Sequence, residues 1–351
     1  MRRLNRYLGK TVLAATFGAM MVLVSLIVIS DLVSQLGNLK GDYDFVTALS
    51  YVMLRVPGIM YEYLSYATFL GCVIGLGIHA NANELVILRA AGVSLLRIGW
   101  AIMRPVLLVV VGGLLWGEYV MPLSAELAEN TRSAALAEPE EGESSGLWHR
   151  EGNEFAYFES VQSNGRLFGI TRYRFDDRGR LLASVHAEEG IYQNGYWQLE
   201  NGVESRFEGR QVDQTKFIHQ AWHTDLSPEQ LKLLVLDPAS LSIQNLYRYA
   251  QNRDRQGLDS RHYWLSFWQK VMQPLVILGL VLVGISFIFG SLRESTMGAR
   301  LTLAVLVGII FEIAQNLLGT SSLALGFSPL LAVLMPTLAS VAFGAWLLKK
   351  N

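Results

Sequence analysis

The residues of this sequence that could do chemistry are acidic side chains placed inside long apolar runs. There are four of them: Asp31, Glu62, Glu118 and Glu312. A charged side chain at the centre of a membrane helix costs about 2.5–3.5 kcal/mol to insert, so it usually faces a bundle interior or a cavity. The pattern therefore indicates transport chemistry rather than bond making or breaking.

Each acid could face the interior of the helix bundle or reach the water at the membrane surface, and its position along its run distinguishes the two. Glu312, Gln315 and Asn316 have the i, i+3 and i+4 spacing that puts side chains on one helix face. This favours a lined cavity or a helix–helix hydrogen bond at Glu312. For Asp31, near the end of its run, we expect a side chain that reaches interfacial water. Three basic residues are expected at about the same depth in the membrane as these acids, toward its outer side: Lys40, Arg55 and Arg132.

Motifs of enzymes are missing from the sequence. It contains neither a phosphate-binding loop, nor a nucleophile elbow, nor a zinc-protease helix. His219 and His223 have a spacing seen in metal sites, but no further ligand is evident near them, and structural histidines are the expectation. We therefore expect no enzyme activity, cofactor or metal in this chain, and another chain must supply any energy. The formal net charge of −1 argues against nucleic acid as a partner.

The elements that must position these residues are membrane helices. Hydrophobic residues make up 51% of the 351 residues and charged ones only 17%. A helix needs about 20 apolar residues to cross the bilayer. Six such runs occur, at residues 12–33, 57–79, 100–121, 267–290, 301–319 and 329–348. Gly71 and Gly75, and also Gly113 and Gly117, have the spacing that lets two helices approach closely.

A long polar insert divides the six runs into three and three. Residues 145–235 alternate apolar and polar side chains, are rich in aromatic and β-branched residues, and contain turn signals at 176–179, 193–195 and 200–202. We expect an α-helical membrane protein with an inserted all-β domain, a sandwich or roll. The domains are then residues 1–130 with the first three helices, the β domain at 145–235, a helical linker at 236–262, and the last three helices at 263–351.

Orientation follows from the basic residues of the short connections. Arg and Lys gather at the amino terminus, between the second and third runs, between the fourth and fifth, and at the carboxyl terminus. Cytoplasmic connections carry such an excess. We expect both termini in the cytoplasm and the β domain outside.

One short stretch, residues 83–92, is neither a span nor a loop. Asn83 is suited to begin a helix, Glu84 lies in its first turn, Arg89 in its last, and Gly92 where it should stop. Leu85 and its apolar neighbours are too few to cross a bilayer. The pattern predicts a helix that lies on the cytoplasmic surface and docks against a partner; the alternative is a helix that packs only against its own bundle.

This stretch resembles the coupling helix of the LptF/LptG family, the paired membrane subunits of the lipopolysaccharide-export ABC transporter. Further matching stretches are residues 4–11, 236–243 and 273–290, in the family's order over nearly the whole chain. The amino-terminal stretch resembles the LptG branch more than the LptF branch. The resemblance implies a jellyroll-like periplasmic β domain in a bacterial inner-membrane protein.

The resemblance also implies partners and site residues. The partners are a homologous LptF-like subunit, a cytoplasmic ATPase dimer that uses ATP and Mg²⁺, a membrane-anchored periplasmic β-jellyroll bridge, and lipopolysaccharide. The coupling residues would be Glu84, Leu85, Leu88 and Arg89; those facing lipid would be Lys40, Arg55, Arg132 and Glu312. Related chains carry several lysines at the end of the first helix where this one keeps only Lys40, so Arg55 is a candidate to hold phosphate instead.

Two other functions stay open at this stage. An ion-coupled carrier could relay protons through Glu62, Glu118 and Glu312, although the halves show no inverted repeat. A structural anchor for an envelope complex would leave the polar membrane residues without a role.

Overall fold

The computed structural model describes residues 2–37, 39, 43–135, 147–161, 166–193, 195–208, 211–224, 226–228, 231, 237–255, 257, 259–289 and 296–350. These residues form two compact units. The helical unit comprises Met1–Val33, Arg55–Ser124 and Pro238–Asn351. The sheet unit comprises Ser34–Leu54 and Ala125–Asp237. The sheet unit thus includes parts of helices as well as the sheet.

The helices follow the apolar runs, with short elements between them. In chain order they are α1 (Arg2–Leu36), α2 (Phe45–Glu62), α3 (Leu64–Asn81), α4 (Glu84–Ala90), α5 (Leu95–Leu115), the π-helix η1 (Trp116–Val120), α6 (Met121–Ala135), the 3₁₀ turn η2 (Pro238–Ser240), α8 (Ile243–Arg255), α9 (Arg261–Phe289), α10 (Met297–Leu325) and α11 (Pro329–Lys350). Six of the described helical segments are long and apolar enough to cross a membrane, which confirms the expected six spans.

Two spans differ from the expected ones. The second run, residues 57–79, is divided at Tyr63, where α2 ends and α3 begins. The third run, residues 100–121, lies within a longer helical path that continues from α5 through η1 into α6. The apolar pattern does not reveal either feature, because a break or a π-turn changes the backbone and not the composition of the run.

The small residues of α3 make the predicted close helix contacts. A Cβ atom at Gly75 would lie 2.9 Å from the Cα atom of Val12 on α1, and one at Gly71 would overlap Thr16. The Gly71-x-x-x-Gly75 spacing is therefore a packing surface for α1. Phe69, Val73 and Leu76 of α3 belong to the core of this unit, together with many residues of α9.

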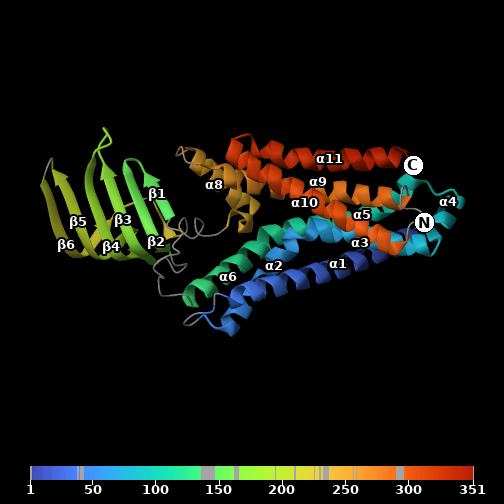
Figure 1. Ribbon diagram of the computed structural model, residues 1–351, viewed down its shortest axis with the longest axis horizontal. Helices are drawn as coiled ribbons and strands as arrows, with labels where there is room; N and C mark the ends of the chain where they lie inside the picture. Colours follow the sequence, from blue (N-terminus) through green and yellow to red (C-terminus); the bar gives the residue numbers. More distant parts are fainter. Residues whose placement is uncertain are drawn as a thin grey trace. The chain divides into compact units, whose positions relative to one another are not determined.

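The helical unit has two distinct ends. Both chain termini lie at the same end as α4, and α8 lies at the other end (Figure 1). The chain therefore returns from the sheet, through η2 and α8, at the end opposite the short helix.

Six strands form one antiparallel sheet in the sheet unit, in the order in which they follow in the sequence (Figure 1). They are β1 (Leu147–Glu151), β2 (Glu154–Val161), β3 (Arg166–Phe175), β4 (Leu181–Gln193), β5 (Tyr196–Glu208) and β6 (Gln211–Trp222). The inserted all-β domain is confirmed. Its described strands are joined consecutively, as in a roll, without a Greek-key crossover among them.

One row of residues across the sheet is left out of the backbone pairing between neighbouring strands, and we call this row the crease. Gly169 and Asn201, which belong to it, have left-handed backbones. The row comprises Glu159, Gly169, Glu188, Asn201 and Ile218. In β3 the buried positions change from odd to even numbers at this row, since Leu167 and then Ile170 are buried. The crease bends the long strands around their own apolar side chains.

The crease corrects one prediction from the sequence. Asn201 and Gly202 were expected to form a turn, like the turn expected at residues 193–195. They lie instead inside β5, where pairing with β4 and β6 continues on both sides. Asn followed by Gly permits a left-handed backbone in a bent strand as readily as in a hairpin.

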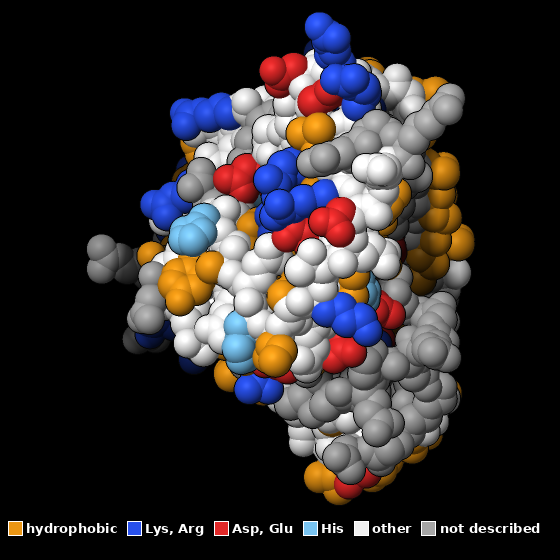
Figure 2. Space-filling model, turned by 90° about the vertical axis from the view of Figure 1, so that its left-hand side faces the viewer, with side chains coloured by type: hydrophobic (Ala, Val, Ile, Leu, Met, Phe, Trp, Pro, Cys, Tyr) orange, Lys and Arg blue, Asp and Glu red, His pale blue; other side chains and the backbone are white. Residues whose placement is uncertain are grey.

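The inside of the bent sheet is apolar and its outside is polar. Phe158, Leu167, Ile170, Trp197 and Leu199 are buried, and the Trp197 indole donates to the Leu226 carbonyl over 2.7 Å. On the side where β6 lies, which faces the viewer in Figure 2, acidic and basic side chains are interspersed with few hydrophobic ones. β6 is exposed over most of its length.

Candidate functional site

The short helix α4 begins and ends as its sequence predicts, with one exception. It runs from Glu84 to Ala90, and Gly92 follows with φ +83°. The Gly92 amide donates to the Arg89 carbonyl and the Val93 amide to the Leu88 carbonyl, which together form a Schellman C-cap. Asn83 was expected to cap the start with its side chain; it has a left-handed backbone and makes no such hydrogen bond.

The carboxylate of Glu84 joins α4 to two long helices. Its Oε2 lies 2.7 Å from Nδ1 of His79 on α3, and its Oε1 accepts from the Tyr7 hydroxyl of α1 over 3.2 Å. The Tyr7 and His79 rings contact edge to face, with centroids 4.9 Å apart. The His79 side chain is 1% exposed and that of Glu84 37%. Glu84 is therefore held by its own chain while part of it stays accessible.

The two faces of α4 differ in burial. Leu85 is buried in the core of the helical unit, and Leu88 packs against that core. Val86 and Ile87 are 45% and 63% exposed, and Arg89 is also exposed. Of the four coupling residues taken from the sequence, Leu85 and Leu88 thus attach the helix to its own bundle. The i, i+3 spacing of these two leucines is the signal that marks the inner face.

A third long helix reaches the same place through Arg300, one of the basic residues between the fourth and fifth apolar runs that indicated only the orientation. Arg300 lies in the first turn of α10 and is 3% exposed. Its Nη1 donates to Asn81 Oδ1 over 3.0 Å and to the Gly77 carbonyl over 3.4 Å. It therefore joins the start of α10 to the end of α3, immediately before α4. The four elements α1, α3, α4 and α10 are joined by polar contacts at one end of the unit.

Asp31 and Arg55 form an ion pair near the other end of the helices. Arg55 Nη1 lies 2.8 Å from Asp31 Oδ2, and the side chains are 43% and 24% exposed. We expected Asp31 to reach interfacial water and Arg55 to be a candidate phosphate ligand. The pair means that an anion approaching Arg55 meets a guanidinium already facing a carboxylate.

Arg132 lies in the sheet unit against an aromatic ring. Its guanidinium lies over the Tyr51 ring, 5.6 Å from the centroid. Nearby, the buried Tyr43 hydroxyl donates to Gln35 Oε1 over 2.9 Å. Burial raises the pKa of Tyr43, and Arg132 partly opposes this. Lys40 lies outside the described residues.

Two of the remaining acids, Glu62 and Glu312, lie close to the same side chain, that of Tyr63. Glu312 is partly exposed on α10, and Glu62 is exposed at the end of α2. Glu118 accepts the backbone N–H of Ile243, at the start of α8, over 2.8 Å.

The histidine pair of the sheet is not gathered into a cluster. His219 Nδ1 lies 3.1 Å from Gln198 Nε2, and His223 stacks on Tyr196. In the part of the chain that the structure describes, no three His, Cys, Asp or Glu side chains lie together as metal ligands would.

Comparison with known proteins covers the chain from end to end. A family model described as lipopolysaccharide export system permease LptF/LptG matches residues 6–350. The chain is 33% identical over 356 residues to the lipopolysaccharide export system permease protein LptG of Haemophilus influenzae, covering 99% of this chain and 98% of that protein. It is 31% identical over 357 residues to the protein of the same name from Escherichia coli K12, with the same coverage.

Proposed function

Since the chain belongs to the LptF/LptG family and is a permease subunit of lipopolysaccharide export, we propose that it receives force through α4 from a cytoplasmic ATPase. The observation that carries this proposal is the set of contacts around Glu84. A seven-residue helix on the surface has little stability of its own. Glu84 and Leu85 attach it to α1, α3 and the core, so a displacement of α4 is passed to long helices rather than absorbed locally.

The surface offered to the ATPase is the outer face of α4. It comprises Val86, Ile87 and Arg89, with the exposed part of the Glu84 carboxylate at its edge. An apolar helix face with one charge at each end suits a groove of matching shape, with a basic group opposite Glu84. ATP and Mg²⁺ would be bound by that partner, and this chain would supply no residue to them.

The orientation in the membrane follows from the same proposal. Both termini and α4 share one end of the helical unit, which we assign to the cytoplasm, in agreement with the basic residues of the connections. The sheet unit is then periplasmic, where it would meet a β-jellyroll bridge. The protein would be a multi-pass protein of the bacterial inner membrane.

A second permease subunit is needed to enclose the lipid. Most of α1 and α10 is apolar and exposed in the chain by itself, including Phe17 and Leu26 of α1 and Ile310 of α10. We assign this surface to a cavity shared with an LptF-like partner. Arg132 and Glu312 are the proposed polar contacts to lipopolysaccharide among the described residues. Arg55 is a weaker candidate because of its pairing with Asp31.

The experiment compares variants of Glu84 in the complex purified from membranes. Glu84→Ala removes the contacts to His79 and Tyr7. We expect normal membrane insertion, but less co-purifying ATPase and about tenfold lower lipid-stimulated ATP hydrolysis, the factor that corresponds to 1.4 kcal/mol.

Two further variants separate the roles of the carboxylate. Tyr7→Phe loosens α1 and leaves the outer face of α4 unchanged, so it should lower ATP hydrolysis without lowering ATPase binding. Glu188→Ala, at an exposed position of β4, is the control. If the Glu84→Ala complex assembles and hydrolyses ATP as the wild type does, α4 is not the point at which force enters this chain.

A further inference from the structure

Two charged residues in the membrane helices are not used by the docking helix or by the proposed lipid contacts. Glu118 lies in η1, and Lys270 lies in α9 and is 5% exposed. Both are inside segments long and apolar enough to span the bilayer. Charges at such depth are expensive and mark function or a specific structural demand.

Both charges act on the backbone of one short segment. The Lys270 ammonium donates to the Leu241 carbonyl over 2.5 Å, and the Ile243 amide donates to Glu118 Oε2 over 2.8 Å. Between them, Ser242 is buried, and its hydroxyl accepts from the Asn245 amide over 3.2 Å. We call residues 238–243 the return strap, because here the chain comes back from the sheet into the helical unit.

The π-helix explains how Glu118 reaches the strap. A π-turn adds a residue to an α-helical turn and so changes the direction of the side chains that follow it. The neighbouring Trp116 donates its indole N–H to the Pro57 carbonyl of α2 over 3.0 Å. On the opposite side, Lys270 lies over the Tyr61 ring, 5.2 Å from its centroid. Helices α2, η1 and α9 therefore meet where they hold the strap.

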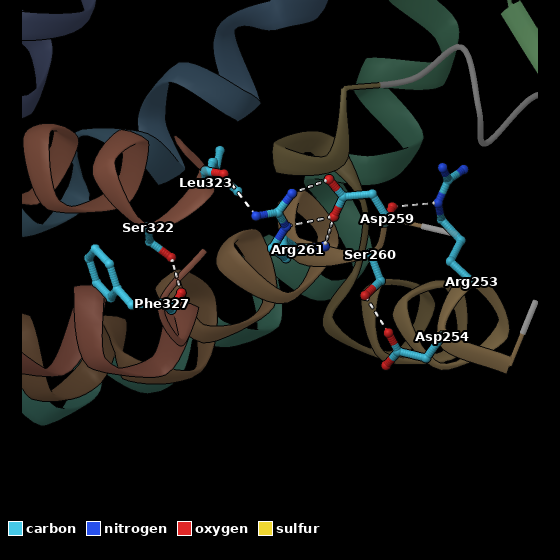
Figure 3. Close-up of polar contacts among 8 residues, drawn as sticks. All are labelled: Arg253, Asp254, Asp259, Ser260, Arg261, Ser322, Leu323 and Phe327. Carbon is cyan, nitrogen blue, oxygen red and sulfur yellow. Dashed lines mark hydrogen bonds and ion pairs between the residues drawn. The ribbon is translucent and has the colours of Figure 1, made fainter. Parts of the chain in front are cut away.

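The far end of α8 is attached as well (Figure 3). Arg253 donates to the Asp259 carbonyl over 2.9 Å, and Asp254 accepts from Ser260 and from the Trp264 indole. Arg261 then donates to the Leu323 carbonyl at the end of α10 over 3.0 Å. Both ends of α8 are thus attached, the first through the return strap to η1 and α9, and the second to the start of α9.

We propose that Glu118 and Lys270 are positioning residues for lipid transfer, which fix the return strap to η1 and α9. This inference rests on the proposed function, because it assigns the motion of the membrane helices to ATP-driven export. When η1 moves relative to α9, the strap must move with them or lose one of its two hydrogen bonds. The movement of the helices thereby reaches the segment through which the chain returns from the sheet, and lipid transfer depends on it.

The test measures amide hydrogen exchange and transport on the same complex, purified from membranes into nanodiscs that contain lipopolysaccharide. Glu118→Ala and Lys270→Met each remove one hydrogen bond to the strap. We expect exchange of residues 241–246 to rise about tenfold, the factor for one charge-assisted hydrogen bond. Lipopolysaccharide passed on per ATP hydrolysed should fall by about tenfold, within the usual range of coupling between sites.

Two matched variants show whether the strap contact itself is responsible. Glu118→Gln keeps an oxygen that can accept the Ile243 amide, so it should restore most of the exchange protection and of the transfer. Trp116→Phe removes a hydrogen bond from the same π-helix without touching the strap, and exchange at 241–246 should stay as in the wild type.

Three results would overturn the inference. Exchange at 241–246 could stay unchanged in both Glu118→Ala and Lys270→Met. Exchange could rise while transfer per ATP stays at the wild-type value, or ATP hydrolysis and transfer could fall in equal proportion. Failure of the proposed function is distinguishable, since Glu84→Ala would then bind the ATPase and hydrolyse ATP as the wild type does, whereas the exchange comparison at 241–246 needs no ATP.

Discussion

Arg300 on α10 donates a hydrogen bond to Asn81 at the end of α3, over 3.0 Å between Nη1 and Oδ1. The two residues are far apart in the sequence and meet beside the helix that we assign to ATPase docking. Arg300 also reaches the Gly77 carbonyl, one turn before Asn81, so its guanidinium contacts the last turn of α3 at two positions. The start of α10 is therefore fixed to the same place as α1 and α4.

Replacing Arg300 should destabilise the helical unit. Arg300→Met keeps the apolar length of the side chain and removes the donors, so we expect the free energy of unfolding to fall by about 1.5–3 kcal/mol, the usual size for hydrogen bonds to charged groups. Thermal unfolding in detergent measures this. Arg255→Met, at an exposed position of α8, is the control. Equal unfolding temperatures for the two variants would contradict a structural role for Arg300.

The two faces of α4 should separate stability from docking. Leu85→Ala empties a buried position, so it should lower the free energy of unfolding by about 2–5 kcal/mol. Ile87→Ala removes an exposed side chain, so it should leave stability within about 0.5 kcal/mol and weaken ATPase binding. Unfolding and co-purification are measured for both variants. An Ile87→Ala complex with full ATPase content would show that the partner does not use this face.

Arg132 should contribute to lipid binding through charge. Arg132→Asp should weaken the binding of a phosphorylated lipid more at low than at high salt, because the Debye length falls from about 30 Å at 0.01 M to about 3 Å at 1 M. Arg178→Asp, at an exposed turn, makes the same change of charge and should have little effect. An equal loss of affinity for Arg132→Asp at every salt concentration would point to misfolding.

Asp259 should make stability depend on pH in acid. Hydrogen bonds from the side chain and backbone of Arg261 hold the pKa of Asp259 at about 2. A lowered pKa contributes stability that is fully present above the unfolded value of about 3.9 and lost as the pH falls through about 2. Because both side chains are exposed, Asp259→Asn should cost less than about 1 kcal/mol at pH 7.

Unfolding of wild type and Asp259→Asn across pH 7 to pH 2 measures this contribution. The difference between the two proteins should disappear toward the acid end, while Asp213→Asn, at an exposed position of β6, provides the control. A difference that is constant with pH would show that the charge of Asp259 is not responsible.

At the crease of the sheet, position 201 should tolerate glycine, whereas a side chain at the neighbouring position 202 should destabilise the sheet. A Cβ atom at Gly202 would lie 2.5 Å from the His186 carbonyl oxygen, so Gly202→Ala should cost about 1–3 kcal/mol. Asn201 has φ +52°, which glycine adopts freely, so Asn201→Gly should be close to neutral. Hydrogen exchange of β4 to β6 in the full chain compares the two. Equal protection in both variants would contradict the expected steric conflict at position 202.

Composition and periodicity by themselves determined six membrane helices, the inserted β domain and the short helix before Gly92, because each depends on local patterns of apolar, turn and capping residues. Tertiary structure decided the rest. Glu84 with Tyr7, Asp31 with Arg55, Arg300 with Asn81 and Glu118 with Ile243 are pairs that only packing brings together. A charge in an apolar run shows that a partner is needed, but the identity of that partner depends on which helices lie side by side. The same limit applies to Asn201 and Gly202, since one backbone conformation serves both a turn and a bend, and only the pairing of the neighbouring strands distinguishes them.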